Sequence, residues 1–159
     1  MKKTLLMIIA ALVMVWAGAS LAADQPKAGD LKEVALVQVK GVKGEAKGTL
    51  VINTASGVDL AIQATGLDPK GVYTAFFVNE KSKMFEGIGP APHALKVNEK
   101  GEADFKGTMK KDSYKRFVQV GIYLNPGGKP LANPVGVAAA LGSLVAKETP
   151  KLILQGKLR

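Results

Sequence analysis

Short apolar stretches alternate with turn residues along most of the chain, at intervals of about ten residues. Residues 58–65 alternate most regularly, and one face of that segment consists of Val58, Leu60, Ile62 and Ala64. A period of two is typical of a strand that buries one face and exposes the other. Strands are therefore predicted over residues 34–39, 49–53, 58–65, 71–79, 93–98, 103–109, 117–124 and 152–158.

Turn chemistry separates several of these strands. Residues 55–57, 98–101 and 126–128 are rich in Gly, Asn, Ser and Pro, the residues that favour tight reversals of the chain. Because short turns join neighbouring strands, antiparallel pairing is favoured. The sequence therefore predicts an all-β fold, a single antiparallel β-sandwich over residues 32–159.

Three segments modify this pattern. Residues 71–79 form a denser apolar run, which is typical of a central strand covered on both faces. Residues 111–116 are predicted to form a short helical turn. Residues 135–146 are rich in Ala and Gly; we expect a strand there, with a brief helix as the alternative, because Gly142 would interrupt a helix.

The N-terminal segment has the order of a secretory leader. Lys2 and Lys3 precede an uncharged run over residues 4–23, and this run ends in small residues. We predict a signal peptide over residues 1–22, with cleavage after Ala22 or, alternatively, after Ala23. An uncleaved membrane anchor is the competing interpretation, because the run is long enough to span a bilayer, but the small residues at its end favour cleavage.

The remaining chain is expected to be periplasmic or secreted in a bacterium, with no transmembrane segment after cleavage. Residues 23–31 are polar and predict a flexible segment before the domain. The chain has no cysteine, so lipid attachment through a cysteine is excluded. Disulfides cannot stabilise the domain either, so its core must be held together by packing.

The charge balance bears on possible partners. The formal net charge is +9, and removal of residues 1–22 with Lys2 and Lys3 lowers it to +7. A basic protein in the envelope favours anionic neighbours, so an envelope protein or another anionic envelope component is the expected partner. Solubility alone is the other explanation for the charge.

Residues 65–74, with the sequence TGLDPKGVYT, resemble a corner found in known sandwich folds. This segment is similar to the one that precedes a core strand in exported immunoglobulin-like and fibronectin type III-like Greek-key modules. The resemblance implies that Leu67 plugs the end of the sandwich, that Pro69 fixes the bend, and that the Tyr73 hydroxyl finds a backbone partner. It implies a fold and no activity, because such folds carry many functions.

Catalytic chemistry is hard to build from these residues. The chain has one histidine, His93, and no thiol, and none of its serines lies in a nucleophile-elbow sequence. The carboxylates are scattered over predicted loops and exposed strand faces. We therefore expect a protein that is not an enzyme and has no cofactor; a small enzyme with an unrecognised site is the least favoured alternative.

A metal site is not expected, but two residues are candidates for one. His93 and Met84 would offer an imidazole and a thioether, a soft pair that suits periplasmic copper. One histidine and one loop methionine cannot fill a coordination shell without further ligands from a partner. A periplasmic copper or other soft-metal binding protein is therefore the alternative hypothesis.

Two segments are candidates for an interaction surface. The loop over residues 80–92 carries Met84, Phe85 and Ile88, which mark either an exposed contact surface or a lid folded over the core. A basic cluster follows, with Lys110, Lys111, Lys115 and Arg116, which would suit a phosphate-bearing partner or an ordinary solvated face. Nucleic acid is not the expected partner, since only Tyr114 is available for stacking there. The leading hypothesis is an exported, non-enzymatic binding module.

Overall fold

The computed structural model describes residues 30–82, 84–130 and 150–159. The predicted signal peptide 1–22, most of the segment 23–31 and the stretch 135–146 lie outside these residues. Within the described part of the chain, no helix has the length and apolar character that crossing a bilayer requires.

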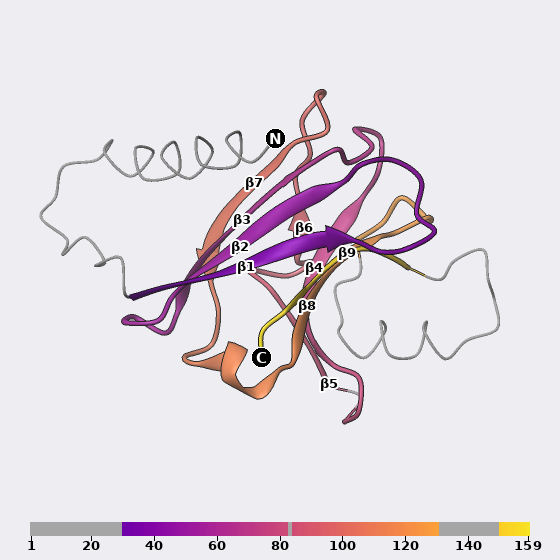
Figure 1. The fold of residues 1–159 in the computed structure, drawn as a ribbon. Coiled ribbons are helices and arrows are strands. Elements are labelled where there is room, and N and C mark those ends of the chain that lie inside the picture. The colour runs from indigo at the N-terminus through magenta and orange to yellow at the C-terminus, as the bar shows by residue number, and fades with distance from the viewer. Residues whose placement is uncertain (1–29, 83, 131–149) are drawn as a thin grey trace, which may run out of the picture.

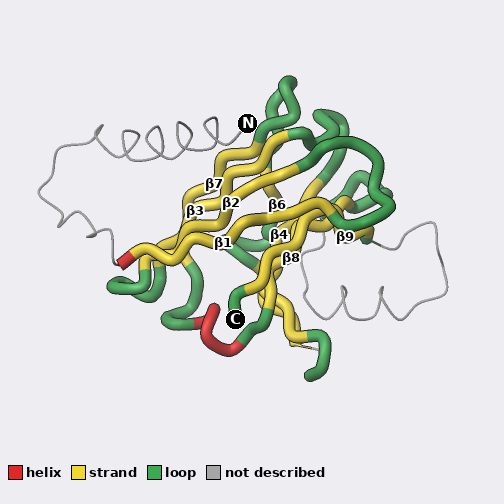
Figure 2. The backbone as a smooth tube through the Cα atoms, viewed as in Figure 1, coloured by secondary structure: helices red, strands yellow, loops and turns green. Residues whose placement is uncertain are grey.

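The prediction of an all-β fold is confirmed (Figures 1 and 2). One short 3₁₀ helix, η3 (Ser113–Arg116), confirms the helical turn predicted over residues 111–116. The strands are β1 (Leu31–Gln38), β2 (Lys47–Asn53), β3 (Asp59–Thr65), β4 (Tyr73–Asn79), β5 (Met84–Gly87), β6 (Ala94–Leu95), β7 (Ala103–Thr108), β8 (Gln119–Leu124) and β9 (Lys151–Lys157).

The strands form one antiparallel sheet. Its order is β5-β4-β8-β9-β1-β2-β3-β7, and β6 pairs separately with β4. The sheet curls into a half-barrel, so the part from β5 to β9 faces the part from β1 to β7 across a shared interior (Figure 1). The two parts meet where β1 and β9 pair over only two positions, Val37 with Gln155 and Gln38 with Leu154.

The main core fills the concave side of this sheet. On β3 the side chains of Leu60, Ile62 and Ala64 are buried, as the alternating pattern predicts. Strand β4 is buried on both faces, which confirms the prediction for residues 71–79. Its second face contributes to a smaller cluster formed by Phe76, Val78 and Tyr123.

The region between β4 and β7 differs from the prediction. A strand was expected over residues 93–98, but only Ala94–Leu95 pairs with β4. His93 precedes it with a left-handed backbone, φ 62°, and Val97 bridges to Ala103 of β7 instead of β4. Residues 76–79 of β4 pair instead with a segment of the predicted loop 80–92, where Met84–Gly87 forms β5.

The corner over residues 65–74 has the local structure that its resemblance implies. Leu67 is 4% exposed and Tyr73 is 3% exposed. The Tyr73 hydroxyl accepts a hydrogen bond from the Asp68 backbone N–H at 2.9 Å, and burial raises the pKa of Tyr73 above its usual value. This confirms the expected packing, while the family itself stays a prediction.

Candidate functional site

His93 is held by contacts within the fold. Its Nδ1 atom lies 2.9 Å from the carbonyl oxygen of Gly89, and in the neutral ring Nδ1–H donates to that oxygen. The ring also meets Phe76 edge to face, with 5.7 Å between ring centroids. It covers Gly87 so closely that a side chain there would collide with it.

Met84 and His93, the two metal-ligand candidates, lie apart in the structure. The backbone of His93 bonds to Ala75 of β4, whereas Met84 pairs with Asn79, about 13 Å further along the strand. The His93 ring covers Gly87, and alternation along β5 places Met84 on the other face. The two candidate ligands therefore lie on opposite faces of β5, and the described residues contain no group of three His, Cys, Asp or Glu side chains suited to a metal.

The large apolar residues of the loop over residues 80–92, namely Met84, Phe85 and Ile88, differ in burial. Ile88 is 1% exposed and belongs to the main core, and its backbone N–H bonds to the Ala75 carbonyl at 2.9 Å. Phe85 is half-buried against the smaller cluster on the other face of β4. Met84 is 41% exposed. The lid alternative therefore applies to Ile88, which is unavailable as a surface contact, whereas Met84 is accessible.

A polar network ties β5 to η3. The hydroxyl of Ser113, which is fully buried, donates to one carboxylate oxygen of Glu86. The other carboxylate oxygen of Glu86 lies 2.7 Å from the Arg116 guanidinium, which also donates to the Ser113 hydroxyl at 3.0 Å. The network therefore fixes the position of η3. The charge of Arg116 is neutralised by Glu86 within the protein.

The remaining cations of η3 lie around Tyr114. Lys115 forms an ion pair with Asp112 at 3.0 Å, and this hydrogen bond raises the pKa of Lys115. Its ammonium group and that of Lys32 lie 5.8 and 6.0 Å from the Tyr114 ring centroid. Lys32 also donates to the Leu158 carbonyl at 2.6 Å, so β1 and the C-terminal residues meet beside η3.

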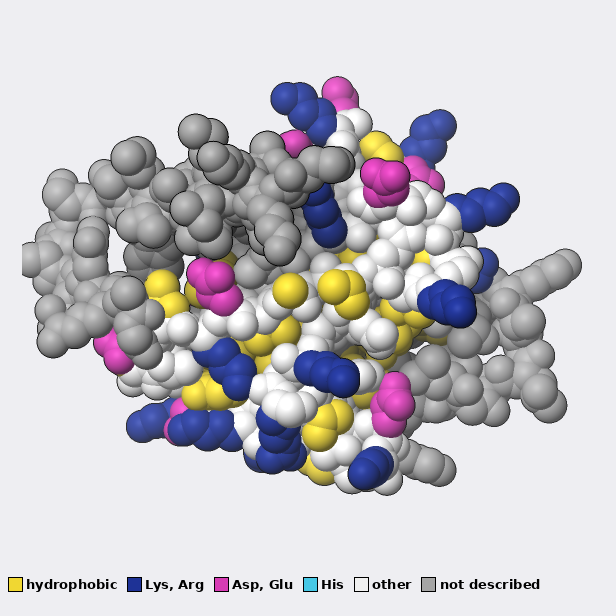
Figure 3. Space-filling model, viewed as in Figure 1, with side chains coloured by type: hydrophobic (Ala, Val, Ile, Leu, Met, Phe, Trp, Pro, Cys, Tyr) yellow, Lys and Arg dark blue, Asp and Glu magenta, His cyan; other side chains and the backbone are white. Residues whose placement is uncertain are grey.

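These contacts bring several cationic segments to one end of the molecule, which we call the η3 end. It comprises η3, the residues 110–112 before it, residues 79–82 and Met84 of the β4–β5 connection, Lys32, and residues 157–159. Dark blue side chains gather over this region at the lower edge of Figure 3. Five exposed cations there have no ion pair within the described residues: Lys81, Lys110, Lys111, Lys157 and Arg159.

The sequence identified only part of the η3 end. It placed Lys110, Lys111, Lys115 and Arg116 in one cluster, and the structure keeps them together around η3. It missed Lys32 and Lys157, which are far from η3 in sequence and reach it only through the sheet order. It also missed that Glu86 neutralises Arg116, because no local pattern links residues 86 and 116.

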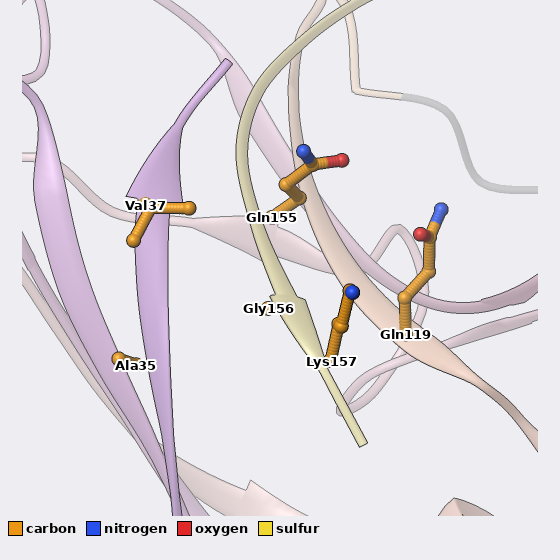
Figure 4. A pocket seen from close by; sticks show the side chains of 6 residues that line it. All are labelled: Ala35, Val37, Gln119, Gln155, Gly156 and Lys157. Atoms are coloured by element: carbon orange, nitrogen blue, oxygen red, sulfur yellow. The ribbon is translucent and has the colours of Figure 1, made fainter. Parts of the chain in front are cut away.

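A groove lies beside this end on the convex face of the sheet (Figure 4). It has a volume of about 460 Å³ and crosses the β1, β9 and β8 strands. Its lining residues are Ala35, Val37, Gln119, Gln155, Gly156 and Lys157. The lining offers two amides and one ammonium group but no nucleophile or carboxylate, so it does not assemble catalytic chemistry.

The comparisons with known proteins add no relative. No family model, curated protein or solved structure matches the chain.

Proposed function

We propose that this chain is an exported, non-enzymatic binding module that contacts an anionic component of the bacterial envelope through its η3 end. The observation that carries the proposal is the convergence of cations from four segments of the chain at one end of the sheet. The leader-like pattern of residues 1–22 supports export.

The pairing of charges supports a contact role for this end. The carboxylates of Asp112 and Glu86 are each engaged by a cation of η3. Glu80 is bonded to the Gln119 amide at 3.0 Å. The exposed Lys110 and Lys111 therefore keep their charge available to a partner.

The contacts of the polar residues support a non-enzymatic function. The His93 ring is engaged by Gly89 and Phe76. The buried Ser113 hydroxyl is committed to a carboxylate that Arg116 already neutralises. Neither group is positioned beside the other as a nucleophile and its base would be.

Retention on bacterial envelopes tests the proposal. The purified chain is incubated with washed envelope fractions, and the bound fraction is measured as the salt concentration rises. We expect binding that weakens with salt and that falls in the double variant Lys110→Gln/Lys111→Gln.

The matched control is Lys40→Gln/Lys43→Gln. Both lysines are exposed in the β1–β2 turn, at the opposite end of β1 from Lys32, so the net charge changes equally. All variants are compared in the same purified form, so that residues 1–29 contribute equally to each. Envelope binding that is absent, or that both double variants reduce equally, would overturn the proposal.

A further inference from the structure

We infer that the anionic component is the surface of a phospholipid bilayer, and that the η3 end docks on it with the Met84 side chain entering the headgroup layer. This inference rests on the proposed function and names its ligand. It requires an exposed cationic surface with an accessible apolar side chain, and the η3 end has both.

The shape of the η3 end favours an extended partner. The described groove opens on the convex face between β1 and β8, and of its lining residues only Lys157 belongs to the η3 end. Lys110, Lys111 and Arg159 are exposed and come from two different segments of the chain. Dispersed charges of this kind attract a plane of phosphates more readily than they hold one discrete anion.

The kind of cation points in the same direction. Oriented recognition of a single phosphate or carboxylate uses the fork of an arginine. Here the Arg116 fork is occupied by Glu86 and Ser113. The cations that remain around η3 are mainly lysines, which are mobile point charges on long stems. A fluid array of headgroups needs charge near its surface and no fixed geometry.

Met84 supplies an apolar contact at the same end. It is 41% exposed and stands at the first position of β5. Alternation places it on the same face of β5 as Glu86, which η3 binds directly. The Met84 thioether therefore stands on the side of β5 where Glu86 meets η3. Burial of this side chain would add attraction that does not weaken with salt.

Vesicle co-sedimentation tests the inference. The purified chain is mixed with vesicles of phosphatidylcholine alone and with vesicles that also contain phosphatidylglycerol. We expect a preference for the phosphatidylglycerol vesicles that declines with salt. Lys110→Gln/Lys111→Gln should weaken this binding about thirtyfold, since each lysine near an anionic surface contributes about fivefold.

Two further variants sharpen the result. The control Lys40→Gln/Lys43→Gln should weaken binding less than about threefold, because its charges lie more than a Debye length from the surface. Met84→Ser should weaken binding by a factor that stays the same at each salt concentration. Equal binding to both vesicle types, or equal loss in the two lysine variants, would overturn the inference.

Two further measurements identify the source of the phosphate and show whether the proposed function stands when the bilayer inference fails. If soluble glycerophosphoglycerol competes with the vesicles, the end holds a discrete phosphate and the bilayer inference fails. If envelope binding persists but is abolished by protease treatment of the envelopes, while vesicles do not bind, the partner is an acidic protein. In that case the inference fails and the proposed binding module stands. If neither envelopes nor vesicles bind, both fail.

Discussion

The packing of Ile88 gives a sharp test of how the loop over residues 80–92 is used. Ile88 is 1% exposed and lies in the main core between β4 and the segment that returns to β6. Replacing it with alanine removes three buried carbon atoms, each worth about 0.8 kcal/mol. With the cavity that remains, the free energy of unfolding should fall by about 3 kcal/mol.

Urea unfolding followed by circular dichroism measures this change. For an m value of about 1.5 kcal/mol per molar, the midpoint should fall by about 2 M. The matched control is Met84→Ala, which truncates the accessible side chain at the start of β5 and should change stability by less than about 0.5 kcal/mol. If Ile88→Ala does not fold, Ile88→Val should still lower stability by about 1 kcal/mol.

The result that would refute this reasoning is specific. If Ile88→Ala and Ile88→Val unfold at the same urea concentration as Met84→Ala, then Ile88 does not fill the core. The loop would then present Ile88 as well as Met84 to a partner, and the surface described for the η3 end would be too small.

Two tyrosines provide further predictions. Tyr73→Phe removes the acceptor of the Asp68 N–H and should lower the free energy of unfolding by about 1 kcal/mol, measured by thermal unfolding against the wild type. Burial, with the Glu80 carboxylate adding to it, raises the pKa of Tyr123 to about 12. Above pH 10 the unfolded chain therefore loses a proton that the folded chain keeps, and stability falls as pH rises. Between pH 9 and 11 the wild type should lose roughly 1–1.5 kcal/mol more than Tyr123→Phe in urea titrations; equal losses would show that this hydroxyl is accessible.

The strands with a regular period were predictable from sequence. β3 alternates over its whole length, and its buried residues are the ones that the pattern selects. β4 was identified as a strand buried on both sides because its apolar residues are contiguous. In both cases the burial is decided by side chains within the strand itself, so a local pattern contains the information.

β5 was not predictable in this way. It has four residues, and its side chains are exposed or half-buried, so no apolar alternation marks it. Its position depends on pairing with β4 and on the bonds from Ser113 and Arg116 to Glu86, which join residues 27 and 30 positions apart. A single sequence contains no signal for such a pairing.

In the candidate site, too, the sequence predicted what depends on neighbouring residues and missed what depends on contacts between distant ones. The cations of residues 110–116 could be grouped because they are neighbours in sequence. The contribution of Lys32 could not, because Lys32 and Leu158 lie 126 positions apart and meet only through the strand order. His93 and Met84 were paired by their chemistry, and the alternation of side chains along β5 separates them.

The junction of β1 with β9 has a consequence for how the half-barrel holds its shape. β1 shares seven register positions with β2 but only two with β9. The side chains of the interior, more than the backbone ladder, therefore keep the two walls of the half-barrel together. A change in the curvature of the sheet would concentrate at this junction, and the groove over Val37 and Gln155 would widen or narrow with it.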